Sequence, residues 1–138
     1  MEPISDTAVG FVEACDSGKG WAACAEYCTP NASFSAQCEV LEGVDTVEGY
    51  CAWMADLLRK LPDGRIEMKS LGVDEARGHV TLFSVFKGTH TGEAGPVPPT
   101  GRSTAADYVY AMEFRGGRLS HLTKIWNAPW TLRELGWA

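Results

Sequence analysis

The chain carries little positive charge and lacks the sequence patterns of several large functional classes. Its 138 residues include 12 lysines and arginines against 18 aspartates and glutamates, which gives a formal net charge of −6. Without a run of basic residues, neither nucleic acid nor an anionic membrane is expected as a partner. No signal peptide, transmembrane run, P-loop, dinucleotide fingerprint or nucleophile elbow occurs. We therefore expect a cytoplasmic protein that uses no cofactor.

The cysteines and histidines do not form a recognisable metal site. The cysteines stand at positions 15, 24, 28, 38 and 51, so their number is odd and no C-x-x-C pair occurs. His79, His90 and His121 show no zinc-binding spacing with one another or with the cysteines. We expect reduced, mostly buried thiols and no bound metal.

The order of helix-like and strand-like segments predicts a single α+β domain over residues 1–138. Apolar periodicity predicts helices at 8–15, 20–28 and 45–61, and β-rich runs predict strands at 32–37, 65–71, 79–90 and on both sides of 115–118, before a last helical turn at 130–135. Asp45 and Glu48 resemble a capping box at the start of the longest helix. Because helices precede most strands, we expect a mostly antiparallel sheet, curved into a cone, with helices packed over its concave face.

The stretch from Ser103 to Trp126 predicts a β-hairpin, because the glycine pair at 116 and 117 separates two β-rich runs. Side chains of a strand alternate between its faces. One face of the hairpin is then mostly aromatic and apolar and carries Tyr108, Tyr110, Met112, Phe114, Ser120, Leu122, Lys124 and Trp126. We interpret this face as the wall of a pocket. By the same alternation, Asp107 and His121 point to the outer face, unless a bulge shifts the register.

Three motifs resemble those of a known family. Residues 88–102 (GTHTGEAGPVPPTGR), 114–119 (FRGGRL) and 131–136 (TLRELG) look like signatures of the SnoaL-like polyketide cyclases. That family lies within the nuclear-transport-factor-2-like and ketosteroid-isomerase-like superfamily of cone-shaped folds. The resemblance spans essentially the whole chain and implies a small-molecule cavity inside the cone.

The resemblance also implies where the chemistry lies. The family's cyclases close a polyketide ring by an aldol step, with an aspartate as general acid/base and a histidine on the neighbouring strand. Counting from the loop and the hairpin turn puts the histidine position on Tyr110 and the aspartate position on Lys124. Both chemical identities have changed in this chain.

Each candidate residue has an alternative interpretation that the sequence leaves open. Lys124 is either a desolvated catalytic lysine or a lysine at the cavity mouth with a solvated ammonium. Tyr108 and Tyr110 are either donors to an oxyanion or ordinary strand aromatics. His90 either fixes the loop that follows it or lines the cavity. The remaining candidates, which are pocket or packing residues, are Trp53, Trp126, Tyr27, Phe34, Leu122 and Met112.

The leading hypothesis is a small-molecule enzyme that acts on a hydrophobic carbonyl compound by cofactor-free enolisation, in the manner of a cyclase or isomerase. Lys124 and Tyr110 supply the polar groups. The alternative is a non-catalytic protein that binds a hydrophobic ligand on the same fold. In both cases we expect a homodimer formed through the outer face of the sheet.

Overall fold

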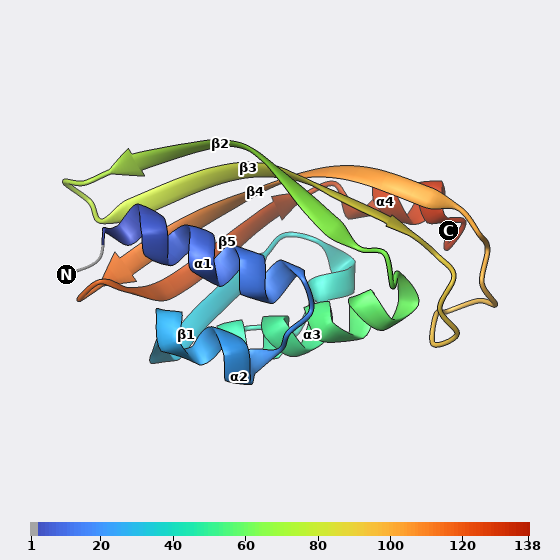
Figure 1. Cartoon of the computed structure of the whole chain (residues 1–138), viewed down its shortest axis with the longest axis horizontal. Coiled ribbons are helices and arrows are strands. Elements are labelled where there is room, and N and C mark those ends of the chain that lie inside the picture. The colour runs from blue at the N-terminus through green and yellow to red at the C-terminus, as the bar shows by residue number, and fades with distance from the viewer. Residues whose placement is uncertain (1–2) are drawn as a thin grey trace.

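A curved five-stranded sheet wraps around helices in the computed structural model, which describes residues 3–138 (Figure 1). The helices are α1 (Ile4–Asp16), α2 (Trp21–Cys24), α3 (Val47–Lys60) and α4 (Ala128–Leu135), with short 3-10 turns at Ala25–Tyr27 and Glu39–Leu41. The strands are β1 (Cys28–Ala36), β2 (Arg65–Asp74), β3 (His79–Thr89), β4 (Ser103–Arg115) and β5 (Arg118–Trp126). Their order across the sheet is β1-β5-β4-β3-β2, with β1 parallel to β5 and the other pairs antiparallel. The predicted α+β class and cone-shaped sheet are confirmed.

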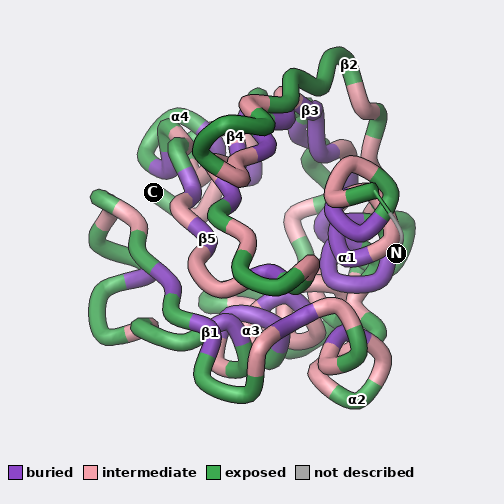
Figure 2. The backbone as a smooth tube through the Cα atoms, turned by 90° about the vertical axis from the view of Figure 1, so that its left-hand side faces the viewer, coloured by how far each residue is buried: buried purple, intermediate pink, exposed green. Residues whose placement is uncertain are grey.

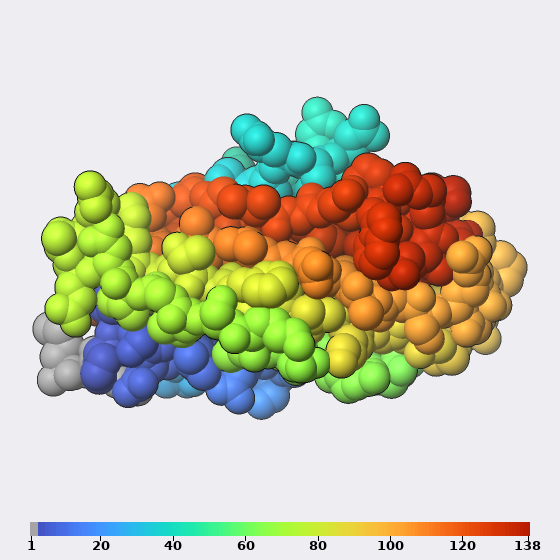
Figure 3. Space-filling view, turned by 90° about the horizontal axis from the view of Figure 1, so that it is seen from above, coloured from blue at the N-terminus to red at the C-terminus, as the bar shows by residue number. Residues whose placement is uncertain are grey.

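The helices α1 and α3 close the concave side of the sheet. In Figure 2 the strands form an arc, and these two helices lie across its open side. Apolar residues one helical turn apart on each helix, such as Phe11 and Cys15 on α1 or Tyr50 and Met54 on α3, are almost fully buried. The outer face, formed by β2 to β5 side by side, is turned toward the viewer in Figure 3. None of the helices within residues 3–138 is long and apolar enough to span a membrane.

Helix α3 begins one residue later than the capping box predicted. The hydroxyl oxygen of Thr46 accepts a hydrogen bond from the Gly49 amide at 3.0 Å, so Thr46 is the N-cap residue. The Asp45 cap was wrong, because the carbonyl of Asp45 instead accepts from the amide of Phe34 at 2.9 Å. This bond ties the start of α3 to β1.

The hairpin of β4 and β5 has the predicted turn and, over most of its length, the predicted faces. Gly116 and Gly117 both have positive φ, as a two-residue turn of this twist requires. Tyr110 pairs with Lys124, and both lie on the concave face. The register shifts between Glu113 and Phe114. The predicted place of Ser120 on the aromatic face was therefore wrong: Leu119 is fully buried instead, and the Ser120 hydroxyl donates to the Glu113 carbonyl.

The loop between β3 and β4 packs tightly on the end of α3. The amide of Gly92 donates to the carbonyl of Lys60 at 3.0 Å. A Cβ atom on Gly92 would lie 1.9 Å from the Arg59 carbonyl oxygen, which no rearrangement of a side chain can relieve. The loop is thus anchored beside the cavity described below.

We expect Gly92→Ala to lower the free energy of unfolding by roughly 1–3 kcal/mol, because the loop or the end of α3 must shift to admit the methyl group. Gly72→Ala is the matched control, since nothing lies within 4 Å of a Cβ built there and its φ is not positive. Chemical denaturation of both variants measures the difference. Equal stability of the two variants would show that the loop does not pack as described.

Candidate functional site

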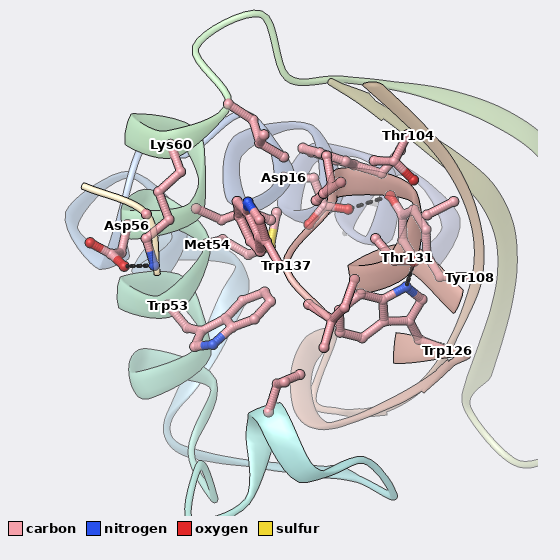
Figure 4. A pocket seen from close by; sticks show the side chains of 18 of the residues that line it. Asp16, Trp53, Met54, Asp56, Lys60, Thr104, Tyr108, Trp126, Thr131 and Trp137 are labelled. Carbon is pink, nitrogen blue, oxygen red and sulfur yellow. Dashed lines mark hydrogen bonds and ion pairs between the residues drawn. The ribbon is translucent and has the colours of Figure 1, made fainter. Parts of the chain in front are cut away.

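A cavity of about 500 Å³ lies between the concave face of the sheet, α3 and α4. Trp53 of α3 and Trp126 of β5 both line it and contact each other edge to face, with ring centroids 6.1 Å apart and ring planes 72° apart (Figure 4). The Trp126 indole is held by a hydrogen bond from its Nε1 to the Thr131 hydroxyl of α4, at 2.9 Å. Asp56 and Lys60, which pair at 2.9 Å, stand at the more exposed rim. The walls are thus mostly aromatic and apolar, which suits a flat hydrophobic ligand.

The floor of the cavity contains a continuous chain of buried hydrogen bonds. Lys124 Nζ donates to the Tyr50 hydroxyl at 2.9 Å, the Tyr50 and Tyr110 hydroxyls lie 2.5 Å apart, and Tyr110 donates to Asp16 Oδ1 at 2.8 Å. Tyr108 donates to Asp16 Oδ2 at 2.5 Å. A phenol carries one proton. Because Tyr110 donates its proton to Asp16, Tyr50 must donate to Tyr110. Each group in the hydrogen-bond chain therefore donates to the next one, from the Lys124 amine to the Asp16 carboxylate.

Lys124 lies inside the cavity wall and not at its mouth, with 7% of its surface exposed. Its Nζ is 4.3 Å from the ring centroid of Trp126, and the rings of Tyr50, Trp53 and Tyr108 lie within 5.4 Å. Burial lowers the pKa of Lys124 to about 8, although the negative charge of Asp16 opposes the shift. The faces of the rings stabilise the ammonium that remains.

Asp16 is the acidic partner of this chain, and sequence reasoning missed it. Its side chain is 1% exposed, at the last residue of α1. Burial raises the pKa of Asp16 above its ordinary value, while the hydrogen bond from Tyr108 and the charge of Lys124 oppose the rise. A signal was available: Asp16 stands four residues after Val12, on the buried stripe of α1, where a carboxylate is costly unless it is bonded.

Burial also keeps the phenols of the chain neutral. It raises the pKa of Tyr108, Tyr110 and Tyr50, and the nearby charge of Asp16 adds to the effect. At neutral pH these phenols therefore donate and accept hydrogen bonds without ionising. Tyr50 lies among the buried apolar residues of α3, and sequence reasoning did not single it out as a polar group of the site.

Five of the ten predicted site residues line the cavity, and five do not. Lys124, Tyr110, Tyr108, Trp126 and Trp53 line it. The others, which the structure places in the surrounding core or loop, are Met112, Leu122, Phe34, Tyr27 and His90.

Each of these five has a physical reason to lie elsewhere. Met112 and Leu122 pair with each other on the concave face, one step nearer the hairpin turn, where the core is closed. Phe34 stacks on the ring of Tyr50 at 4.4 Å. Tyr27 packs against Gly10 of α1.

His90 fixes the loop. Its Nδ1 accepts hydrogen bonds from Trp137 Nε1 at 2.9 Å and from the Thr100 amide at 3.2 Å. The first of these bonds ties the loop to Trp137, two residues after the end of α4. Trp137 itself lines the cavity, so His90 acts on the cavity only through its neighbour.

The outer face contains the two polar residues that strand alternation placed there. Asp107 is exposed on β4. His121 Nδ1 lies 2.6 Å from the Ser33 hydroxyl of β1, away from the cavity. Neither contributes to the chain of hydrogen bonds on the floor.

Three thiols are the one group of side chains in residues 3–138 whose spacing could hold a metal ion. The sulfur atoms of Cys15, Cys24 and Cys51 lie within 4.8 Å of one another, all buried. Hydrogen bonds among these thiols, and burial, raise the pKa of Cys15 well above its ordinary value. The hydrogen bonds with Cys15 and Cys51 lower the pKa of Cys24 to about 4, so the three thiols share their protons. Because all three are buried within the hydrophobic core, we assign the cluster to the core.

The fold and cavity define an α+β cone of the ketosteroid isomerase-like class. A protein with that fold from Catenulispora acidiphila, solved with trimethylamine, has a TM-score of 0.71 at 13% identity, over 96% of this chain and 94% of that chain. The family model of the SnoaL-like polyketide cyclases matches residues 6–135. The chain therefore belongs to the SnoaL-like family, as its motifs indicated.

Two solved structures illustrate the likeness within this class. IdmH from Streptomyces antibioticus, a proposed polyketide cyclase, is 25% identical over 98% of this chain and 99% of that chain, with a TM-score of 0.79. AclR from Streptomyces galilaeus, a proposed hydroxylase, is 22% identical over 96% of this chain and 95% of that chain, with a TM-score of 0.77. No curated protein was found to match the chain.

We expect Lys124→Met to raise the free energy of unfolding at pH 7 by roughly 1–3 kcal/mol, because the cost of burying the ammonium exceeds its attraction to Asp16. The folded pKa of Lys124, about 8, lies below the ordinary 10.5, so burying the ammonium costs stability fully below pH 8. Asp16 can take up a proton once the ammonium is gone. The stability gained by Lys124→Met becomes smaller as the pH rises from 8 toward 10.5, because the Lys124 amine of the folded wild type is then neutral and no longer costs stability.

Thermal denaturation across this pH range measures the effect. Lys69→Met is the control, because the Lys69 side chain is 43% exposed and its removal costs little. If Lys124→Met were less stable than the wild type at pH 7, this would contradict the claim that burying the Lys124 ammonium costs stability.

Proposed function

We propose that this chain is an enzyme that binds a flat, hydrophobic carbonyl compound and catalyses its enolisation without a cofactor, as a step in cyclisation or isomerisation. The observation that carries the proposal is the buried chain of hydrogen bonds between Lys124 and Asp16 on the cavity floor. Enolisation needs a proton acceptor and a group that stabilises the negative charge developing on oxygen. The hydrogen-bond network has a candidate proton acceptor, Asp16, at one end and a positively charged group, Lys124, at the other.

Asp16 is the proton acceptor. Its raised pKa makes it a stronger base than an exposed carboxylate. Tyr108 and Tyr110 occupy one lone pair on each of its oxygens, which orients the carboxylate and leaves other lone pairs for a proton from carbon. The neutral phenols cannot serve as bases themselves. Tyr110, predicted as a catalytic residue, then positions Asp16.

Lys124 stabilises the enolate. With a pKa of about 8, Lys124 carries a positive charge in most molecules of the protein at pH 7. Its Nζ uses one N–H on Tyr50, and an ammonium has three. The free donors can bind a carbonyl oxygen, and the apolar surroundings strengthen the attraction to a developing oxyanion.

The cavity limits the substrate class. A volume of about 500 Å³ accommodates a compound with two or three fused rings. The indoles of Trp53 and Trp126, which both line the cavity and meet edge to face, offer aromatic surface for contact with a ring system. The likeness to IdmH, a proposed polyketide cyclase, supports a polyketide-derived ring system.

The second candidate function is a binding protein without catalysis. It is favoured by the replacement of the family's aspartate position by Lys124. Asp16 weighs against it, because a carboxylate with 1% exposure is costly to keep in a wall that only has to bind. The cytoplasmic location and the homodimer stay predictions.

Asp16→Asn tests the proposal. The assay measures deuterium uptake from heavy water into the methyl group of 2-acetonaphthone, a flat aryl methyl ketone, by NMR. We expect the wild-type chain to accelerate the exchange and Asp16→Asn to lower the rate by roughly 100-fold or more, because the acceptor is lost. Asp107→Asn, an exposed carboxylate on the outer face, is the control and is expected to keep the wild-type rate.

Two results would contradict the proposal in different ways. Equal exchange by Asp16→Asn and the wild type would exclude Asp16 as the acceptor. Binding of the ketone without any acceleration by the wild type would favour the binding protein.

A further inference from the structure

We propose that Lys124 is also a nucleophile, whose amine captures the carbonyl carbon of the ligand as an imine inside the cavity. This inference rests on the proposed function, because it places a carbonyl compound in the same cavity. It goes further, since it replaces an electrostatic contact by a covalent bond. The protonated imine then takes the place of the ammonium as the positive group that withdraws electrons from the substrate.

The first support is the placement of the amine. Lys124 lines the cavity from near the end of β5, an inner strand of the sheet, and its Nζ has four aromatic rings within 5.4 Å. The hydrogen bond to Tyr50 fixes its position further. A nucleophile held on a rigid strand loses little freedom when it attacks a bound carbonyl.

The second support is the supply of neutral amine. With a pKa of about 8, about a tenth of the Lys124 side chains are uncharged at pH 7, against fewer than about one in a thousand for an exposed lysine. The groups that act on this amine come from several elements: the phenols of α3 and β4, with Asp16, Cys15 and Cys38. Of these, Asp16, Cys15 and Cys38 raise the pKa, and burial outweighs them.

The third support is a path for the protons that imine formation has to move. The amine lone pair forms the C–N bond while the carbonyl π electrons go to oxygen, and nitrogen gives up a proton. The carbinolamine oxygen then takes up protons and leaves as water while the C=N bond forms. The sum is one carbonyl and one amine giving one imine and one water, with no oxidant or reductant.

The hydrogen-bond chain can serve both steps. Tyr50 accepts a proton from Nζ and passes its own to Tyr110, which passes one to Asp16 over gaps of 2.5 and 2.8 Å. The reverse movement returns the proton to the nitrogen, which gives the protonated imine, while the carbinolamine oxygen takes up its protons from solvent water and leaves as water. The protonated imine makes the C–H bonds of the ligand carbon next to it more acidic. Asp16 can then take a proton from that carbon to give an enamine. The chemistry selects aldehydes and ketones, since esters and amides do not form imines.

Reductive trapping tests the inference on the wild-type chain. The protein is incubated with 2-acetonaphthone and sodium borohydride at pH 7 to 8, and modified peptides are located by mass spectrometry. We expect one adduct per chain, on Lys124, with little on the other lysines. Lys124→Arg, which keeps the charge but cannot form an imine, should give none. Lys69→Arg, on the exposed surface of β2, should trap as the wild type does.

The pH dependence adds a second reading. Asp16 holds the pKa of Lys124 up, so Asp16→Asn should lower that pKa and shift trapping toward lower pH. Modification of Lys124 no faster than that of exposed lysines would overturn the inference. This comparison uses only the wild-type chain, so it holds even where a variant fails to fold.

The outcomes separate the imine from the proposed function. If the wild type accelerates the deuterium exchange but gives no adduct, imine capture is excluded and enolisation by charge stabilisation stands. If Lys124 is trapped but the wild type does not accelerate exchange, the amine captures ketones and the proposed enolisation fails. If neither adduct nor exchange occurs, both are overturned.

Discussion

The structure depends on placing one lysine and one aspartate out of water in the same cavity. Each charge alone would cost several kcal/mol to bury. Two phenols, Tyr50 and Tyr110, join them by hydrogen bonds and so reduce this cost without bringing the charges into contact. Because burial disfavours both charged forms, the pKa of Lys124 is lowered and the pKa of Asp16 is raised. Both groups are thereby moved toward neutral pH, where acid–base chemistry needs them.

The fold supplies these groups from four elements that meet only when the domain is complete. Asp16 ends α1, Tyr50 lies on α3, Tyr110 on β4 and Lys124 on β5. The curvature of the sheet brings β4 and β5 against both helices (Figure 2). A site built from rigid helices and strands keeps its distances better than one built from loops. The loop between β3 and β4 contributes only at the rim, where His90 and Trp137 hold it.

Local sequence patterns predicted the elements well and the site in part. The glycine pair at 116 and 117 and the alternation of β4 and β5 were enough to place Tyr110 and Lys124 on one face. The same alternation failed at Ser120, because a bulge changes the face without leaving a sequence signal. Asp16 was missed because contacts between α1 and the sheet are set by tertiary packing, although its position on the apolar stripe was a clue. Phe34 and Tyr27 could not be assigned, since an aromatic residue looks the same in a core and in a cavity.

The family comparison adds the scaffold but not the reaction. The motif resemblance predicts that the family's aspartate position falls on Lys124, and in the structure the carboxylate that lines the cavity floor is Asp16 of α1. Folds of this kind host many functions, so the chemistry has to be argued from the site itself.

The most direct measurement of the central claim is the protonation of Lys124. In protein labelled with ¹⁵N and ¹³C at lysine, NMR follows the Nζ and Cε signals of residue 124 across the pH range. The account predicts a midpoint near pH 8 in the wild type, and a lower midpoint in Asp16→Asn, because Asp16 helps to hold the proton on the amine. A midpoint near the ordinary 10.5, or one that Asp16→Asn leaves unchanged, would show that the two groups are not joined in one buried site.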